Sequence, residues 1–279
     1  MDNSINRMVK HLNKLISDRG RIVVRYHCDA DGISCALLMY RMFSHFNINA
    51  TFVQNNSAVY SMEDALRDIM YYDMGTNYIF LDFGNNPESL EGINVLKREA
   101  GSIAIIDHHL TEKSEGEKEI VVTPVYHELG GEYTAGLVTF EIVRRVIDID
   151  YDELYKISLH GDKSILEFEK NKKIEEISLV FDYIASTIKR EKHSIRFIDS
   201  LLEDNEFMHT IYLKAKDLVD EVAEIGLEIC KKKELENGFL FVTLDVEKIV
   251  DNTNSFPSRG KVTGKVHDII EEQTDKPLI

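Results

Sequence analysis

The chain has 279 residues, and its 49 Asp and Glu outnumber its 33 Lys and Arg, which gives a formal net charge of -16 at pH 7. This balance argues against a basic protein that coats nucleic acid and against a partner at an anionic membrane surface. An enzyme whose bound cations supply local positive charge stays possible. Because 43% of the residues are hydrophobic, sizeable cores can form. Because domains have about 150 residues, this length predicts about two domains.

Cysteine usage and hydropathy indicate the compartment. The three cysteines Cys28, Cys35 and Cys230 form no CxxC pair, which argues against a disulfide framework or a zinc ribbon. The N-terminal stretch MDNSINRMVKHLNKLIS lacks the continuous apolar run of a signal peptide. No stretch reaches the about 18 apolar residues that a membrane helix requires. We therefore expect a soluble cytoplasmic protein without a membrane partner.

Helical and strand patterns alternate in the first half of the chain. Apolar residues at helical spacing predict a first helix, from Ile5 to Ile16. Strands are expected over 21–27, 51–53, 78–81 and 102–106. The helices expected between and after them cover 33–43, 62–71, 87–98, 133–146 and 152–159. This alternation is typical of a parallel α/β sheet with helices on its faces.

The pattern changes after residue 163. The chain is charged and is expected to be helical from 164 to 236, including one long helix over 205–233. A new strand pattern, FLFVTL, follows at 239–244, and a loop with Pro257 and Gly260 leads to a helix over 264–272. We therefore predict an α/β domain over 1–163, a helical connector over 164–236 and the start of a second small α/β domain over 237–279.

Carboxylate and imidazole side chains stand where three of the expected strands end. In strand order they are His27, Asp29 and Asp31; then Asp82; then Asp107, His108 and His109. The carboxyl ends of parallel strands meet at one edge of the sheet, where ligands gather. Carboxylates brought together there repel one another, and a cation relieves that repulsion. Imidazole and carboxylate without thiolate favour Mn²⁺, with Mg²⁺, Fe²⁺, Co²⁺ or Zn²⁺ as alternatives.

The number of these side chains points to two ions rather than one. A single ion takes about four to six ligands, and the set above, together with a later Asp, exceeds that. Two ions about 3.5–4 Å apart form the apparatus for phosphoester hydrolysis. Each element has a structural alternative when taken alone: Asp82 as a helix N-cap, Asp31-Gly32 as a turn, and His108-His109 as a surface pair.

Four motifs in this order resemble those of the DHH phosphoesterase superfamily: His27-x-Asp29-x-Asp31-Gly32, Leu81-Asp82, Asp107-His108-His109 and Gly161-Asp162-Lys163-Ser164. That superfamily includes RecJ single-strand exonucleases, nano-RNases, cyclic-dinucleotide phosphodiesterases and family II pyrophosphatases. The first motif, with Phe256-Pro257-Ser258-Arg259-Gly260-Lys261, is most similar to archaeal RecJ-like proteins of the GINS-associated nuclease type. The resemblance implies a DHH domain followed by a DHHA1-like domain. The glycine-rich GGGH-type stretch of such second domains is absent from this chain.

The resemblance also implies roles for individual residues. Two divalent ions are expected, held by six side chains: His27 and Asp29 for the first, Asp31, His108 and Asp162 for the second, and Asp82 as the bridge. Three residues are expected to be catalytic: Asp82, Asp107, which orients the imidazole of His108, and His109, which faces the scissile phosphate. The expected substrate-binding residues are His109, Ser258, Arg259 and Lys261.

These observations favour a Mn²⁺-dependent exonuclease acting on single-stranded DNA or RNA ends in replication, repair or RNA turnover. A strand-tracking groove combines basic and aromatic side chains, whereas the candidate basic residues here are scattered without an aromatic ladder: Lys163, Lys170, Lys172, Lys173, Lys189, Arg190 and Arg259. A nano-RNase or other hydrolase of short phosphoesters is therefore the first alternative. The second is a replisome protein that binds GINS or the replicative helicase, with a weak or vestigial nuclease site.

Overall fold

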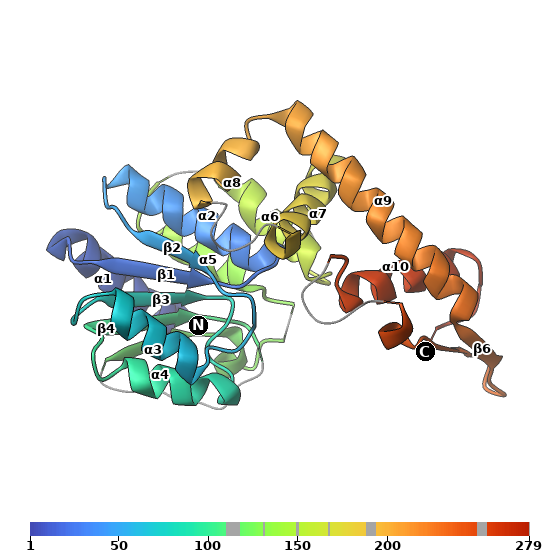
Figure 1. The fold of residues 1–279 in the computed structure, drawn as a ribbon, viewed down its shortest axis with the longest axis horizontal. Coiled ribbons are helices and arrows are strands. Elements are labelled where there is room, and N and C mark those ends of the chain that lie inside the picture. The colour runs from blue at the N-terminus through green and yellow to red at the C-terminus, as the bar shows by residue number, and fades with distance from the viewer. Residues whose placement is uncertain are drawn as a thin grey trace.

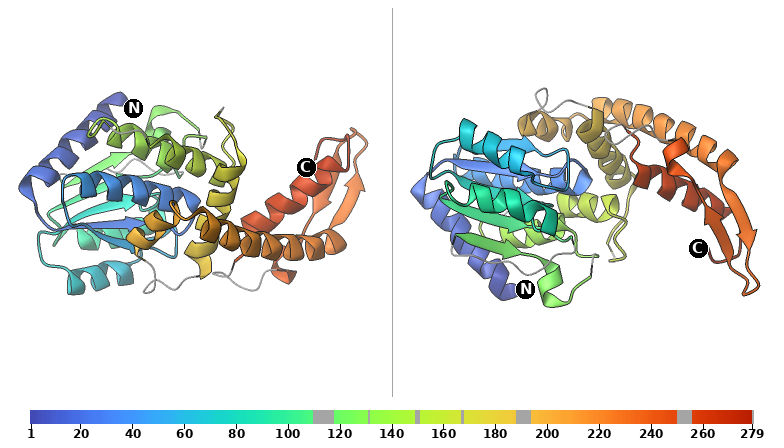
Figure 2. Two further views of the ribbon diagram at one scale, coloured as in Figure 1. Left: turned by 90° about the horizontal axis from the view of Figure 1, so that it is seen from above. Right: turned by 60° about the horizontal axis from the view of Figure 1, so that its bottom comes forward.

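The computed structural model describes residues 1–109, 118–130, 132–148, 151–166, 168–187, 194–249 and 256–278. Figure 1 shows a larger α/β body, a long helix α9 (Asn205–Ile229) that leads away from it, and a smaller body that contains α10 (Arg259–Glu272). Figure 2 shows from two further sides that α10 lies along the far part of α9. Within the described ranges, no helix is both long enough and apolar enough to span a membrane.

A five-stranded parallel sheet forms the centre of the larger body, in the order β2-β1-β3-β4-β5. The strands are β1 (Ile22–Tyr26), β2 (Thr51–Gln54), β3 (Asn77–Leu81), β4 (Ser102–Ile106) and β5 (Glu119–Val122). Tyr26, Leu81 and Ile106 are paired in register, so three strands end at the same level. The strand order reverses between β1 and β3, and ligands of such sheets bind beyond the carboxyl ends at this position. The predicted parallel α/β sheet is confirmed, although the sequence did not reveal β5.

Helices cover both faces of this sheet because successive strand residues point to opposite sides. Val24 and Ile79 pack into one apolar core, while Val23 and Phe80 pack into another. The first core is covered by α1 (Asp2–Asp18), α2 (Ala30–His45), α5 (Ala135–Val143), α6 (Asp152–Gly161), α7 (Lys172–Thr187) and α8 (Ile195–Leu201). The second is covered by α3 (Met62–Tyr71) and α4 (Leu90–Leu96). The described residues also contain the 3₁₀ turns η1 (Pro87–Ser89), η2 (Pro124–His127) and η3 (Val246–Lys248).

The smaller body corrects two expectations. Residues 231–234 were expected to be helical, but Lys231–Glu234 is strand β6, antiparallel to β7 (Leu240–Thr243). Long-range pairing explains this, because Leu240 and Val242 of the partner strand pack with Val266 of α10. The last helix begins at Arg259 rather than near 264, because the Ser258 side chain caps it by accepting the backbone N–H of Lys261.

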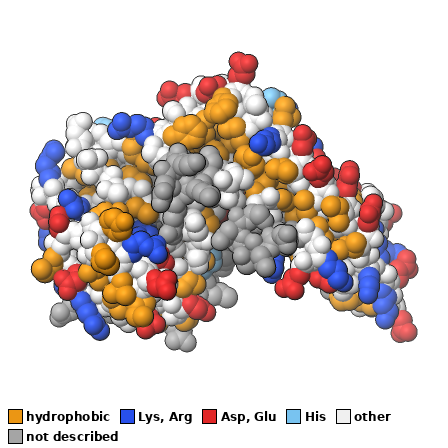
Figure 3. Space-filling view, viewed as in Figure 1, with side chains coloured by type: hydrophobic (Ala, Val, Ile, Leu, Met, Phe, Trp, Pro, Cys, Tyr) orange, Lys and Arg blue, Asp and Glu red, His pale blue; other side chains and the backbone are white. Residues whose placement is uncertain are grey.

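Figure 3 shows acidic side chains along the outer edge of α9. The exposed carboxylates of this helix stretch include Asp217, Glu221, Glu224 and Glu228. This edge repels a nucleic-acid backbone, so any contact with one has to lie elsewhere on the molecule.

Candidate metal centre

The turn between β1 and α2 carries three of the expected ligands. Asp29 caps α2, because its carboxylate accepts the backbone N–H of Gly32 at 2.9 Å. A Cβ at Gly32 would lie 2.4 Å from the backbone oxygen of His27, so only glycine allows the first turn of the helix to pack this closely. The spacing His-x-Asp-x-Asp-Gly therefore compresses His27, Asp29 and Asp31 into one turn at the carboxyl edge of the sheet.

Asp31 is fully buried and is held by the start of α5. Its two oxygens accept the backbone N–H groups of Ala135 at 2.9 Å and Gly136 at 2.7 Å, and the hydroxyl of Ser158 donates at 2.7 Å. The positive end of a helix stabilises a carboxylate in this position. A Cβ at Gly136 would lie 2.4 Å from the Ser158 side chain and 2.8 Å from Asp31 Oδ1, so glycine is required for this packing. Sequence reasoning missed these partners, and the small residues at the start of α5 were the available signal.

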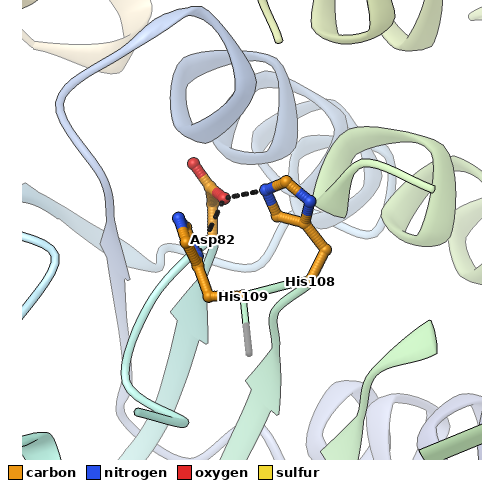
Figure 4. Close-up of side chains that lie close together, drawn as sticks. All are labelled: Asp82, His108 and His109. Atoms are coloured by element: carbon orange, nitrogen blue, oxygen red, sulfur yellow. Dashed lines mark ion pairs between the residues drawn. The ribbon is translucent and has the colours of Figure 1, made fainter. Parts of the chain in front are cut away.

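Asp82 lies at the centre of the cluster. It follows β3 with φ +64, is 1% exposed, and has no well-aligned hydrogen bond to either carboxylate oxygen among the described residues. Oδ1 lies 3.3 Å from Nε2 of His108, and Oδ2 lies 3.4 Å from Nδ1 of His27. Figure 4 shows Asp82 facing His108 and His109. Burial, with repulsion from Asp31 and Asp29, raises its pKa well above the usual range. A bound cation would remove the cause of this shift.

The residues Asp107, His108 and His109 follow β4, and the two imidazole side chains have different partners. Nε2 of His108 lies 3.6 Å from Asp31 and 3.2 Å from Asp162, so this imidazole joins two carboxylates from different helices. The expected contact between Asp107 and the imidazole of His108 is not found among the described residues. Its Oδ1 accepts from both the backbone N–H and Nδ1 of His109, at 3.1 and 2.7 Å. The reason is local: an Asp side chain readily bonds the backbone two residues on, which draws His109 over the carboxylate. The hydrogen bond that His109 donates to Asp107 raises the pKa of His109.

Asp162 reaches the cluster because α6 ends against α2. A Cβ at Gly161 would lie 2.8 Å from the Cβ of Ala30, so the glycine lets the two helix ends approach. Loss of solvation within the cluster raises the pKa of Asp162 well above the usual range, although its side chain is still 24% exposed, and the nearby Asp31 and Asp82 carboxylates add to the shift. Asp162 is the expected fourth-motif residue, and the structure places it beside the other ligands.

Two groups of side chains in the described residues therefore fit a pair of cations. In each, the potential ligand atoms lie within 4.8 Å of one another: His27, Asp29 and Asp82 in the first, and Asp31, His108 and Asp162 in the second. Asp82 also forms a group with His108 and His109, so it adjoins both sites. Carboxylates that repel one another, of which Asp31 and Asp82 are buried, suit ions such as Mn²⁺ or Mg²⁺ together with the imidazole nitrogens. The residues present fit two divalent ions.

The expected substrate-binding residues of the smaller body do not all reach this centre. Ser258 caps α10, and the guanidinium of Arg259 lies 3.8 Å from Glu247. Lys261 Nζ, in contrast, lies 2.5 Å from a carboxylate oxygen of Asp182 on α7. Sequence reasoning missed Asp182, because nothing distinguishes it within a charged helical stretch. Of the scattered basic candidates, Lys189 and Arg190 lie outside the described residues.

Residues 21–188, more than half of the chain, match the model of the DHH family, N-terminal domain. The chain belongs to the DHH family. An uncharacterized protein of Methanocaldococcus jannaschii is 24% identical over 98% of this chain and 44% of its own length. The chain thus spans less than half of the curated relative that it matches.

Solved structures show the same fold. The DHH domain of a member of a family of ribosomal proteins superposes with a TM-score of 0.85 at 22% identity, over 99% of this chain and 74% of that chain. RecJ from Thermus thermophilus, in complex with Mn²⁺, superposes with a TM-score of 0.63 at 14% identity, over 99% of this chain and 45% of that chain. The expected DHH fold of RecJ-like proteins is therefore confirmed.

Proposed function

We propose that this chain is a two-metal phosphodiesterase that degrades single-stranded DNA or RNA from an end. The observation that carries the proposal is the buried Asp82 carboxylate, which turns one oxygen toward His27 and the other toward His108. One carboxylate therefore adjoins two ligand groups, as a binuclear site requires. DHH-family membership supports the same chemistry, because the family consists in general of metal-dependent phosphoesterases.

The candidate ligands form two sets, one for each ion. His27 and Asp29 would hold one ion, Asp31, His108 and Asp162 the other, and Asp82 both. When bound, two such ions activate water and stabilise the attacking and leaving oxygens of a phosphoester. The O and N donors favour Mn²⁺, and Mg²⁺ or Co²⁺ also suit them. The three donors to Asp31 hold that carboxylate in one orientation, which the geometry of such a site demands.

Two observations support a role for His109 on the substrate rather than as a metal ligand. Its Nδ1 is committed to Asp107, which leaves Nε2 as the nitrogen that can donate to a phosphate oxygen. The imidazole side chain is 40% exposed, whereas those of His108 and His27 are 13% and 17% exposed, so His109 faces the accessible side of the cluster. Because Asp107 raises the pKa of His109, the ring retains its proton closer to neutral pH and can stabilise developing negative charge.

A hydrolase of short oligonucleotides is the second candidate, and the charge distribution favours it. Lys163 lies 3.3 Å from Asp268, so this lysine near the centre already has an acidic partner. A pocket of about 760 Å³ beside Asp162 is lined by Lys163, Ser164, Ile165, Leu166, Phe168 and Lys170. Such a short basic and aromatic lining suits a few nucleotides better than a long strand.

The test is a comparison of substrates in the presence of Mn²⁺. The protein is incubated with 5′- and 3′-labelled single-stranded DNA and RNA, with di- to pentanucleotides and with pyrophosphate. Progressive shortening of long strands to mononucleotides is expected. Cleavage of only the shortest substrates would favour the second candidate, while inactivity on all of them with capture of GINS or a helicase would favour a replisome-binding role.

A site variant and metal removal serve as controls. Asp82→Ala should lose nearly all activity, because both ions lose a shared ligand, and EDTA should have the same effect on the unchanged protein. Activity of the Asp82→Ala variant at the wild-type rate would show that the site has been assigned wrongly.

A further inference from the structure

One buried carboxylate connects the ligand-bearing turn to the smaller body. Asp182 on α7 is 8% exposed, and its Oδ1 accepts the backbone N–H of Ala30 at 2.8 Å. Ala30 stands between the ligands Asp29 and Asp31 at the start of α2. The other oxygen of Asp182 lies 2.5 Å from Nζ of Lys261, which α10 extends from the smaller body. Asp182 thus contacts both the turn that carries the ligands and the smaller body.

The ammonium of Lys261 lies at the edge of the candidate metal centre. Its side chain is 26% exposed, and Asp29 and Asp162 attract it in addition to Asp182. A second ion pair between the bodies, from Lys163 to Asp268, has side chains that are 60% and 54% exposed. Because solvent screens exposed pairs, that contact contributes little. The partly buried pair of Asp182 and Lys261 is therefore the more specific of these two links.

An ammonium has three donors, so the contact with Asp182 leaves two of them for another acceptor. A lysine on a free four-carbon stem loses rotamer entropy when it binds a ligand, and anchoring it beforehand reduces that cost. Near a binuclear phosphoesterase centre, the acceptor that arrives from solution carries phosphate oxygens. The pair therefore has the chemistry of a prepositioned phosphate contact.

We propose that Asp182 is a positioning residue that holds the Lys261 ammonium beside the metal centre, where it contacts a phosphate of the bound strand. Asp182 itself does not touch the substrate. This inference rests on the proposed phosphodiesterase function. It adds that a residue of α7 affects substrate affinity by holding Lys261 in place. It also assigns a role to the docking of α10 against the larger body.

Steady-state kinetics of three variants test the proposal: Asp182→Asn, Lys261→Met and the double variant. Asn keeps an oxygen for the N–H of Ala30 but removes the charge that holds Lys261. On a single-stranded oligonucleotide with saturating Mn²⁺, each single change should raise KM about tenfold, equivalent to about 1.4 kcal/mol, and alter kcat less than about twofold. The double variant should match the single variants, because both changes remove one interaction.

A matched control separates this effect from general damage. Asp199→Asn removes a carboxylate that is 27% exposed, against 11% for Asp182, from its 2.7 Å pair with Arg41, at a contact between α2 and α8. This variant should keep the wild-type KM. Lys261→Arg should recover part of the lost affinity, because a guanidinium retains the charge and pairs with both carboxylate and phosphate.

A second measurement needs neither metal nor activity. In metal-free protein, amide hydrogen exchange in the first turns of α10 should accelerate about tenfold in both single variants and no further in the double variant. An active wild type whose variants keep their KM, or whose effects simply add, would overturn the inference and leave the proposed function intact. A wild type that hydrolyses none of the substrates would overturn both.

Discussion

Replacing the central carboxylate should stabilise the metal-free protein while removing its activity. Asp82 is 1% exposed and lacks a well-aligned hydrogen bond among the described residues, so without a cation it is a costly buried group. Asp82→Asn removes the charge at nearly constant shape. We therefore expect the free energy of unfolding of the metal-free variant to exceed that of the metal-free wild type. The sign is opposite to that of most buried substitutions.

The size of the effect follows from the geometry. The ligand oxygens of Asp29 and Asp82 lie within 4.8 Å of each other. At an effective dielectric constant of about 20, two unit charges about 4.8 Å apart repel by about 3.5 kcal/mol. The imidazole of His27, 3.4 Å from Asp82, offsets part of this repulsion when it is protonated, and proton uptake by Asp82 limits the rest. A net gain of about 1–2 kcal/mol is therefore expected, in the range of other stabilising substitutions.

Thermal and urea unfolding of EDTA-treated protein measure this gain. About 1 kcal/mol corresponds to about 2–4 °C in Tm for a chain of roughly this size. The raised pKa means that folded Asp82 binds more protons than unfolded Asp82, so wild-type stability falls as the pH rises above about 3.9. The advantage of Asp82→Asn should accordingly shrink at acid pH and grow toward neutral pH.

The control is Asp73→Asn, since Asp73 is 80% exposed in its pair with Arg21 and should change stability little. Added Mn²⁺ should stabilise the wild type more than Asp82→Asn, because the variant has lost a shared ligand. If metal-free Asp82→Asn protein is less stable than the wild type at neutral pH, the Asp82 carboxylate does not destabilise the metal-free fold, and the reasoning is refuted.

Three further outcomes are expected. Mn²⁺ affinity should rise with pH, because the raised pKa values of Asp82 and Asp162 mean that cations displace protons, and calorimetry in two buffers would detect that release. His109→Gln should lower kcat by about 10²–10³ with little change in Mn²⁺ affinity, measured by single-turnover kinetics and calorimetry. Gly136→Ala should reduce stability by about 1–3 kcal/mol in urea unfolding, because the new Cβ would lie 2.4 Å from Cβ and Oγ of Ser158 and 2.8 Å from Oδ1 of Asp31. Gly260→Ala, where a Cβ has open space, is its control.

Each of these outcomes can fail. Mn²⁺ affinity that is independent of pH would mean that the two carboxyls are already ionised in the metal-free state. A His109→Gln variant with wild-type kcat would show that the imidazole does not act on the substrate. Equal stability of the Gly136→Ala and Gly260→Ala variants would show that the start of α5 moves away from Ser158 and Asp31 without cost.

The sequence predicted the sheet and most of the ligand set because both depend on local spacing. Each of three apolar strands is followed by carboxylate or imidazole residues, and parallel strands place their carboxyl ends together. Asp82 and His108 could therefore be assigned to one cluster without coordinates. The short strand β5 was missed because EIVV follows residues with no clear pattern, and β6 was missed because four consecutive charged residues resemble a helix surface.

Contacts between distant segments could not be predicted. The partner of Asp107 proved to be His109, which depends on how the chain turns after β4. The donors to Asp31 come from residues more than 100 positions away, and Asp182 joins α7 to α2 and α10. No local pattern encodes such pairs, because each depends on where the helices pack.

The amino-acid order alone determined which side chains follow the strands, and hence that carboxylates and imidazoles would crowd one edge of a parallel sheet. Only the tertiary structure decided how they divide around Asp82, which of them are held by helix ends, and how Asp182 joins the turn that carries them to Lys261 of the smaller body. The physical reason is that spacing along a strand is set by backbone geometry, whereas the pairing of distant charges depends on the packing of whole helices.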